Sequence, residues 1–185
     1  TSLDDLVARC REVGLDRIAL TDHNTAAGAF ELLRLHPELA IAGEEVKTRE
    51  GEVIGLFITE PVKPWLAPEE AMDLIHGMGG LTYLAHPFDR FRASFAPDRV
   101  VALAPRIDII ETYNAWSRPV DNRAAADLCA ELGKVAATGS DAHHPRELGL
   151  SWMEMAAYEG PGDFLAKLRQ ARHVVTELSG TQRRA

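Results

Sequence analysis

Cysteine is scarce in this chain of 185 residues, which contains only Cys10 and Cys129. The two lie far apart in the sequence, each within a stretch of helical spacing, so no disulfide framework is predicted. No apolar run approaches the roughly 20 residues that a membrane-spanning helix needs, and the first residues lack the charged-then-apolar pattern of an export signal. We therefore expect a cytoplasmic protein with no membrane partner.

Positive charge is also in short supply. The 20 Lys and Arg residues against 28 Asp and Glu residues give a net charge of -8. A broad face for nucleic acid needs clustered Lys and Arg that displace counterions from the phosphates. The balance argues against nucleic acid as a partner and leaves a single nucleotide or another small phosphorylated substrate open. No feature of the sequence indicates the oligomeric state.

The length and the hydrophobic content of 46% are sufficient for one domain with a real core. We expect that domain to span residues 1–185, with its core at about 2–175 and a frayed tail at 179–185.

Helical and strand patterns alternate along the chain. Ser2 caps the first expected helix, which Gly14 ends, and Pro68 suits the first turn of a later one. Helices are expected at 3–13, 26–35, 68–78, 119–132 and 163–171, and strands at 17–21, 39–46, 52–59, 81–85, 107–113, 134–139 and 152–157. Strands 39–46 and 52–59 are candidates for a hairpin, and the segment 89–105 has no clear pattern beyond a short helix near 98–103. This alternation favours an α/β barrel or an open parallel sheet.

Side chains that bind divalent metal ions recur where the expected strands end. They are Asp22, His23, Glu45, His86, Glu111, Asn114, Asp141 and His143. Loops after the strands of an α/β barrel build its active site, so these residues should converge. Carboxylates and imidazoles without thiolates suit Mn, Zn or Fe in a catalytic site better than a structural zinc site. The number of ligands exceeds what one ion needs and indicates two or more ions.

Each of these residues also has a plainer interpretation. His23 is as well explained by a role at the start of the next helix, for which Asp22 is an able cap. For His144, a contact with substrate or with a ligand residue competes evenly with an exposed loop position. Glu44 and Glu45 should point to opposite faces of a strand, so only one can enter the site. Ser140 has no recognisable base partner, which leaves covalent catalysis unsupported. The remaining histidines, placed away from strand ends and expected at the surface or in packing, are His36, His76 and His173.

Taken in order, five segments resemble the motif series of the PHP family of polymerase and histidinol phosphatase domains. They are Thr21-Asp22-His23-Asn24-Thr25, Gly43-Glu44-Glu45, Leu84-Ala85-His86-Pro87-Phe88, Ile110-Glu111-Thr112-Tyr113-Asn114 and Gly139-Ser140-Asp141-Ala142-His143. The resemblance extends over about residues 2–175. It implies a distorted (β/α)7 barrel, two or three divalent metal ions (Mn, Zn or Fe), and phosphoester hydrolysis by a metal-activated water.

The same resemblance assigns roles to single residues. The metal ligands it implies are His23, Glu45, His86, Asp141 and His143. Glu52 stands where many relatives have a histidine; it is either a substituted ligand or a solvent-facing strand entry. Beside these, we expect catalytic roles for Asp22 and His144 and substrate contacts from Asn24 and Asn114. No residue is assigned as the general base.

The chain departs from the family at its start. Family members begin with a strand that bears a His-x-His pair, and Thr1-Ser2-Leu3 resembles the segment that comes directly after that strand. The expected fold is therefore an α/β barrel of PHP type whose first strand is missing. Loss of residues from the chain is favoured over a truncated relative, because a barrel without one strand exposes two unpaired edges.

These observations predict a metal-dependent hydrolase of a small nucleotide or sugar phosphate. One alternative is a degenerate PHP module that binds metal or a partner without turnover, which the missing first motif favours. The other is an exonuclease like that of polymerase-associated relatives. The acidic balance counts against an exonuclease, although the arginines between Arg90 and Arg106 offer phosphate contacts.

Overall fold

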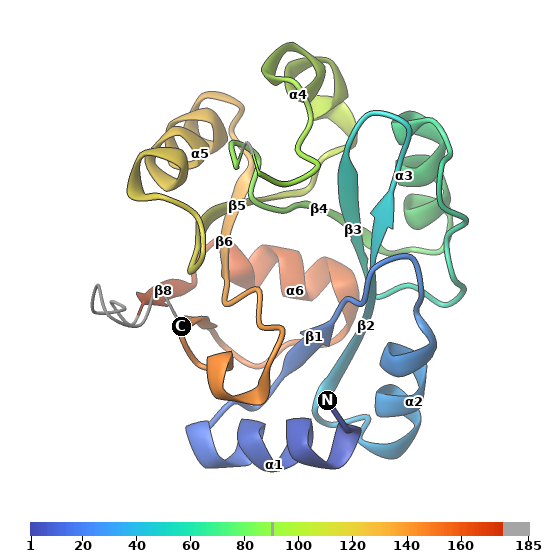
Figure 1. Cartoon of the computed structure of the whole chain (residues 1–185), viewed down its shortest axis with the longest axis vertical. Helices are drawn as coiled ribbons and strands as arrows, with labels where there is room; N and C mark the ends of the chain where they lie inside the picture. Colours follow the sequence, from blue (N-terminus) through green and yellow to red (C-terminus); the bar gives the residue numbers. More distant parts are fainter. Residues whose placement is uncertain (90, 176–185) are drawn as a thin grey trace.

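Helices and strands alternate along most of the chain in the computed structural model, which describes residues 1–89 and 91–175 (Figure 1). The helices are α1 (Leu3–Val13), α2 (Ala27–Leu35), α3 (Pro68–Gly77), α4 (Pro97–Leu103), α5 (Pro119–Glu131) and α6 (Gly160–Leu168), with short 3-10 helices at Ala104–Arg106 and Pro145–Glu147. The strands are β1 (Ile18–Leu20), β2 (Ala40–Lys47), β3 (Glu52–Leu56), β4 (Leu81–Leu84), β5 (Ile109–Asn114), β6 (Val135–Gly139), β7 (Ser151–Glu154) and β8 (Arg172–Val175). The expected tail at 179–185 lies outside the described residues.

Six strands form one mixed sheet in the order β1-β2-β3-β4-β5-β6. Neighbours pair in parallel except around β3, which runs antiparallel to both β2 and β4. The turn between Lys47 and Glu52 is too short for a parallel crossover, so β2 and β3 form the hairpin that the sequence indicates. The sheet curls into a half barrel. The α/β class is thus confirmed, whereas closure into a seven-stranded barrel stays a prediction.

Two expected strands differ from their predicted setting. The strand expected at 152–157 is β7, but it pairs with β8 in a separate antiparallel ribbon. The strand expected to be buried at 17–21 is β1, in which Ala19 is exposed. Its exposure follows from its position, because β1 is an edge of the main sheet and pairs only with β2.

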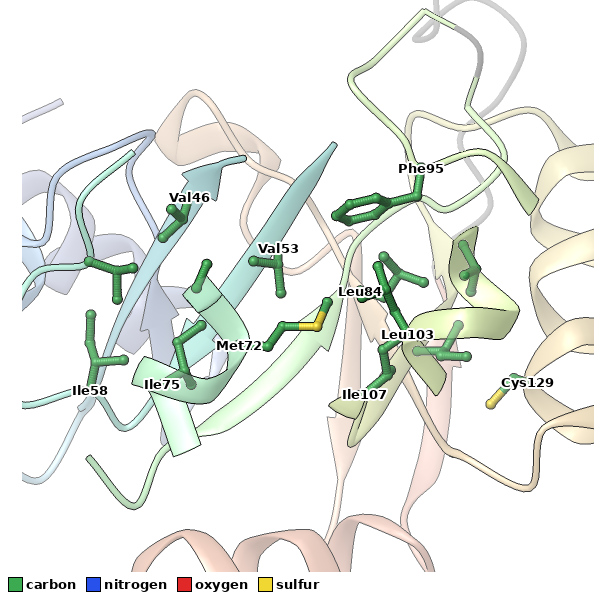
Figure 2. Packing of buried hydrophobic residues seen from close by; sticks show 14 of the residues in the cluster. Val46, Val53, Ile58, Met72, Ile75, Leu84, Phe95, Leu103, Ile107 and Cys129 are labelled. Carbon is green, nitrogen blue, oxygen red and sulfur yellow. The ribbon is translucent and has the colours of Figure 1, made fainter. Parts of the chain in front are cut away.

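Alternate side chains of the sheet enter two separate clusters. Tyr83 and Ile109 face the inside of the curl, where Phe164 of α6 packs against them. Leu84 and Ile110 face outward. Figure 2 shows the outer cluster, in which Met72 and Ile75 of α3 and Leu103 of α4 lie against the strands. A site enclosed by the sheet must therefore lie on the inner side of the curl.

The first helix begins and ends as the sequence predicts. The Ser2 hydroxyl accepts a hydrogen bond from the backbone N–H of Asp5, and Gly14 ends α1 in the left-handed region at φ 74°. Both cysteines are buried and free. Among the described residues, no helix is both long enough and apolar enough to cross a membrane.

Candidate metal centre

The inner face of the sheet changes from apolar to acidic toward one end. Glu45 lies four residues after Ile41 on β2 and Glu111 two residues after Ile109 on β5, so each keeps the inward orientation of the apolar residue before it. Glu52 is the first residue of β3, and because β3 runs antiparallel, its first residue lies where β2 ends. Three carboxylates therefore meet at one end of the half barrel.

One group of metal-type ligands combines His23 with two of these carboxylates. Ligand atoms of His23, Glu45 and Glu52 all lie within 4.8 Å of one another. His23 is held beside β2 by a parallel bridge to Glu45, in which Asn24 N–H donates to the Glu45 carbonyl at 2.9 Å. The structure thus brings together three predicted ligands, among them Glu52, for which a solvent-facing position was the alternative.

His86 extends this group toward the centre of the sheet. Its Nε2 atom lies 3.4 Å from Oε1 of Glu45, and both side chains are buried. Burial works to raise the pKa of Glu45, but the neighbouring His86, His23 and Arg92 outweigh it and lower that pKa. Burial works to lower the pKa of His86, and the carboxylates of Glu45 and Glu111 outweigh it in turn. The charges of the group are therefore mutually stabilising.

Two buried atoms in this group test whether a metal ion fits. Nδ1 of His86 has no hydrogen-bond partner among the described residues, and Oε1 of Glu45 has none beyond its 3.4 Å ion-pair contact with Nε2 of His86. An unpaired buried polar atom costs about 1–3 kcal/mol, so folded proteins rarely leave one without a purpose. Carboxylate oxygens and imidazole nitrogens are both good ligands for Mn, Zn or Fe. The donor set and its unpaired atoms fit a divalent cation.

Asp141 and His143 form a second group next to the first. Nδ1 of His143 lies 3.8 Å from Oδ1 of Asp141, and the His143 ring centroid is 6.4 Å from that of His23. Asn114 Nδ2 donates to Asp141 Oδ2 at 3.1 Å. The second group thus lies close to His23, and both groups line the same cleft.

Glu111 lies beneath both groups and is buried. It accepts hydrogen bonds from the Tyr83 hydroxyl at 2.9 Å, from the His86 backbone N–H at 2.8 Å and from Asn114 Nδ2 at 3.0 Å. Burial raises the pKa of Glu111. A Cβ atom at Gly139 would lie 2.2 Å from Glu111 Oε1, so any larger residue there would have to displace the Glu111 carboxyl. Sequence reasoning counted Glu111 among the metal-type side chains at strand ends but gave it no role of its own. The available signal was its inward orientation, two residues after Ile109 on β5.

Three of the five described non-glycine residues with positive φ angles lie at this site, the other two being Phe57 and Trp65. Asn24, His86 and Asp141 have positive φ angles of 56°, 32° and 48°. Such conformations cost on the order of 1–3 kcal/mol for a residue with a side chain, and they cluster at functional sites, where the surroundings hold them. Asn24 Oδ1, for example, accepts from the backbone N–H of Lys47 at 2.9 Å.

The two asparagines expected to bind substrate both make structural hydrogen bonds. The bond from Lys47 engages the amide oxygen of Asn24. Asn114 donates to two carboxylates, and its oxygen accepts from Trp116 N–H at 2.9 Å. These bonds orient neighbouring groups of the site, and direct contact of either residue with substrate stays a prediction.

Asp22 and His144, the two expected catalytic residues, line the cleft. Both Asp22 and His144 are exposed. Asp22 does not cap α2, which has no side-chain cap; its carboxylate instead lies over Gly28, where an added Cβ would be 2.8 Å away. His144 caps the short helix Pro145–Glu147, and its N–H donates to Glu147 Oε2 at 3.0 Å. Both side chains are accessible to a bound molecule, and their catalytic roles stay predictions.

A single cleft of about 1180 Å³ contains all the residues of both groups except Glu52. The inner cluster forms its floor, and residues of β1 and β6 line its sides. These two strands are the edges of the main sheet, so the cleft follows the gap between them.

Sequence reasoning did not single out Arg92, which follows β4 in the segment without a clear pattern. Its guanidinium group forms an ion pair with Asp141 and lies 3.6 Å from Oδ2 of Asp89. A cation therefore contacts a predicted metal ligand directly.

The chain matches one protein-family model and is similar in sequence to a protein of an archaeon. The family model described as PHP-associated matches residues 119–173. The uncharacterized protein MJ1587 of Methanocaldococcus jannaschii is 35% identical over 131 residues, which are 68% of this chain and 75% of that protein.

Two solved structures share the fold at low sequence identity. A two-domain protein of Bacteroides vulgatus that contains a predicted PHP-like metal-dependent phosphoesterase superposes with a TM-score of 0.71 at 17% identity, over 94% of this chain and 60% of that one. The lesion-specific endonuclease PfuEndoQ of Pyrococcus furiosus superposes with a TM-score of 0.65 at 15% identity, over 91% and 52%. This chain thus spans little more than half of either protein.

Replacing Glu111 by Gln should change how stability depends on pH. The folded-state pKa of Glu111 is raised, so the neutral acid stabilises the fold. That stabilisation is complete below about pH 4 and is lost as the pH rises through the folded-state pKa. Gln stays neutral, so the unfolding free energy of wild type minus that of E111Q should fall as the pH rises above about 4, the ordinary pKa of a glutamate, as measured by urea unfolding.

Glu31→Gln is the matched control. Glu31 is an exposed residue whose pKa the hydrogen bond from Arg34 lowers. The unfolding free energy of wild type minus that of E31Q should therefore be small and should rise with pH. A difference for E111Q that does not change with pH would show that the buried carboxyl is not held in its neutral form.

Proposed function

The chain belongs to the PHP family, and from that membership we propose that its cleft is the active site of a metal-dependent phosphoesterase. The observation that carries the proposal is the convergence of six predicted ligands at one end of the half barrel, with unpaired buried atoms on Glu45 and His86. The substrate is a small phosphorylated molecule, such as a nucleotide or a sugar phosphate.

The residues divide between two adjacent positions for divalent ions. His23, Glu45 and Glu52 would hold one ion, with His86 beside them, and Asp141 and His143 would hold another. Two or three ions of Mn, Zn or Fe fit this donor set. Such ions supply Lewis-acid polarisation of a phosphoryl oxygen and a water of lowered pKa.

Other residues of the chain position the ligands and complete the chemistry. Asn114 holds the Asp141 carboxylate through its Nδ2 donor, and Glu111 fixes the backbone N–H of His86. Asp22 and His144, on the rim, are the groups proposed to carry protons between the site and solvent, and Asn24 is the remaining proposed substrate contact. The proposed setting is the cytoplasm. With a net charge of -8, a small substrate is favoured over nucleic acid.

We also propose that one further strand closes the half barrel between β1 and β6 to give the distorted (β/α)7 arrangement. Both strands are sheet edges and line the same cleft, and Thr1 lies on that cleft at the start of α1. A strand followed by α1 and then by β1 would be a parallel crossover unit of the usual kind.

Hydrogen exchange tests this closure. Amide groups on the free edge of β1 should exchange rapidly in the 1–185 chain and become protected in the full-length translation product. Unchanged exchange at β1 in the longer protein would contradict the added strand.

Metal binding should stabilise the protein through Glu45 and not through Glu44. Glu44 points away from the cleft and accepts from Val62 N–H at 2.8 Å. Mn²⁺ at a hundred times its dissociation constant should stabilise the wild type by about 2.7 kcal/mol, measured as a shift of the thermal transition. Glu45→Gln should lose most of that shift and Glu44→Gln should keep it. Equal losses in the two variants would contradict the assignment.

Activity should require both the metal ions and the second ligand group. Chelation should abolish hydrolysis of a phosphoester panel, and Mn²⁺ should restore it. Asp141→Asn or His143→Ala should lower kcat/KM by at least about 100-fold, beyond the typical effect of removing a residue that only supports a ligand. His36→Ala is the control, because His36 lies outside the cleft beside Glu38.

The same experiment separates an enzyme from a binding module. A folded protein that binds Mn²⁺ and yet hydrolyses no member of the panel would contradict the phosphoesterase and favour a module that binds without turnover. Processive digestion of single-stranded nucleic acid would instead favour the exonuclease.

A further inference from the structure

Glu147 is a buried acidic residue that takes no part in the proposed chemistry. It is the last residue of the short helix Pro145–Glu147, and it does not line the cleft. Its Oε2 atom accepts from the backbone N–H of His143 at 2.8 Å and from that of His144 at 3.0 Å. Hydrogen bonds of a backbone donor to a carboxylate are charge-assisted and strong. Glu147 therefore holds the loop of the second metal group from outside the cleft.

Helix capping explains only one of these two hydrogen bonds. In a capping box, the third helical residue accepts from the backbone N–H of the N-cap residue, and Glu147 and His144 have this relation. The bond from His143 reaches one residue further back, to a predicted metal ligand. It meets a loop that needs support, because the positive φ angle of Asp141 costs on the order of 1–3 kcal/mol unless the surroundings hold it.

The residues after Glu147 anchor this support on α1. Leu148 is buried in a cluster with Leu6 and Val7 of α1. At the next residue the chain passes close to the end of the helix, since a Cβ atom at Gly149 would lie 3.3 Å from Cβ of Val13. Glu147 thus connects the loop of His143 to a helix that is capped at both ends. Support of this kind holds a site more precisely than a loop does by itself.

The orientation of the His143 ring depends on the same backbone. Nδ1 of His143 lies 3.0 Å from the backbone carbonyl oxygen of Asp141. A carbonyl oxygen only accepts, so Nδ1 carries the proton in this hydrogen bond and Nε2 keeps a free lone pair. Such a bond fixes the tautomer and the ring orientation of a histidine that binds metal. By holding the N–H of His143, Glu147 keeps the ring within reach of the Asp141 carbonyl.

We propose that Glu147 is a positioning residue for the second metal group. Its carboxylate fixes the backbone at His143 and His144, so that Nε2 of His143 and the carboxylate of Asp141 are oriented for one ion before that ion binds. The inference rests on the proposed function and adds to it a residue that contacts neither metal nor substrate. Loss of a residue that supports a metal ligand typically weakens metal binding by about 10–100-fold.

Calorimetric titration with Mn²⁺ tests this role without depending on turnover. Glu147→Ala should weaken by about 10–100-fold the class of bound Mn²⁺ that Asp141→Asn also weakens, and it should leave the other class unchanged. Glu147→Gln should recover most of the loss, because its amide oxygen can accept from the same N–H groups. The matched control is Glu44→Ala, which removes another buried carboxylate that accepts a backbone N–H outside the cleft. It should lower the unfolding free energy and leave both classes of Mn²⁺ unchanged.

NMR spectroscopy gives two readouts that need no metal ion. The backbone N–H groups of His143 and His144 should exchange slowly in the wild type, although both residues are exposed, and faster in Glu147→Ala. Long-range ¹H–¹⁵N spectra of the neutral His143 ring should show the proton on Nδ1 in the wild type and a mixture of tautomers in Glu147→Ala. Glu147→Gln should resemble the wild type in both measurements.

A role in stability alone predicts a different pattern. Equal Mn²⁺ affinities in wild type and Glu147→Ala, or equal losses in Glu147→Ala and Glu44→Ala, would overturn the inference. A Glu147→Gln variant as weak as Glu147→Ala would overturn it too, because charge and not the hydrogen bonds would then support the ion. Rapid exchange of the His143 amide in the wild type would overturn it without any variant. If Mn²⁺ binding depends on Glu147 as expected but no phosphoester is hydrolysed, the proposed function fails and the positioning role stands.

Discussion

The buried carboxylate of Glu111 is the interaction through which the strands of the site are joined. It receives hydrogen bonds from Tyr83, from the His86 backbone and from Asn114, which in turn holds Asp141. One acid thus connects β4, β5 and the loop after β6. Removing it would leave three donors without an acceptor in a buried place, at a cost for each. The positions of His86 and Asp141, two predicted metal ligands, thus depend on Glu111.

Simple physical rules predicted much of this arrangement from the sequence. The period of two along a strand correctly required that only one of Glu44 and Glu45 enter the cleft, and Glu45 is that residue. Capping rules located the start and end of α1 at Ser2 and Gly14. His23 and Glu45 were both expected at strand ends, and they lie close together in the structure. The ends of neighbouring parallel strands meet whatever their separation in the sequence.

Other features depend on contacts that no local pattern contains. Arg92 lies in a segment without periodicity, and its partner Asp141 comes from a different loop. β7 pairs with β8 in a separate ribbon, and strand propensity alone does not specify which strand is its neighbour. Exposure of β1 likewise reflects its place at the sheet edge and not its composition. In each case, the feature depends on a contact between residues far apart in the sequence, which no local pattern links.

The lack of a side chain at Gly139 restricts how this protein can vary. Gly139 is the last residue of β6 and has no side chain that could bind a ligand. Even the methyl group of an alanine at this position would collide with Glu111. Any substitution at Gly139 would therefore have to displace the Glu111 carboxyl from the donors that hold it. Anyone redesigning the cleft for another substrate would have to leave this glycine in place or move Glu111 together with it.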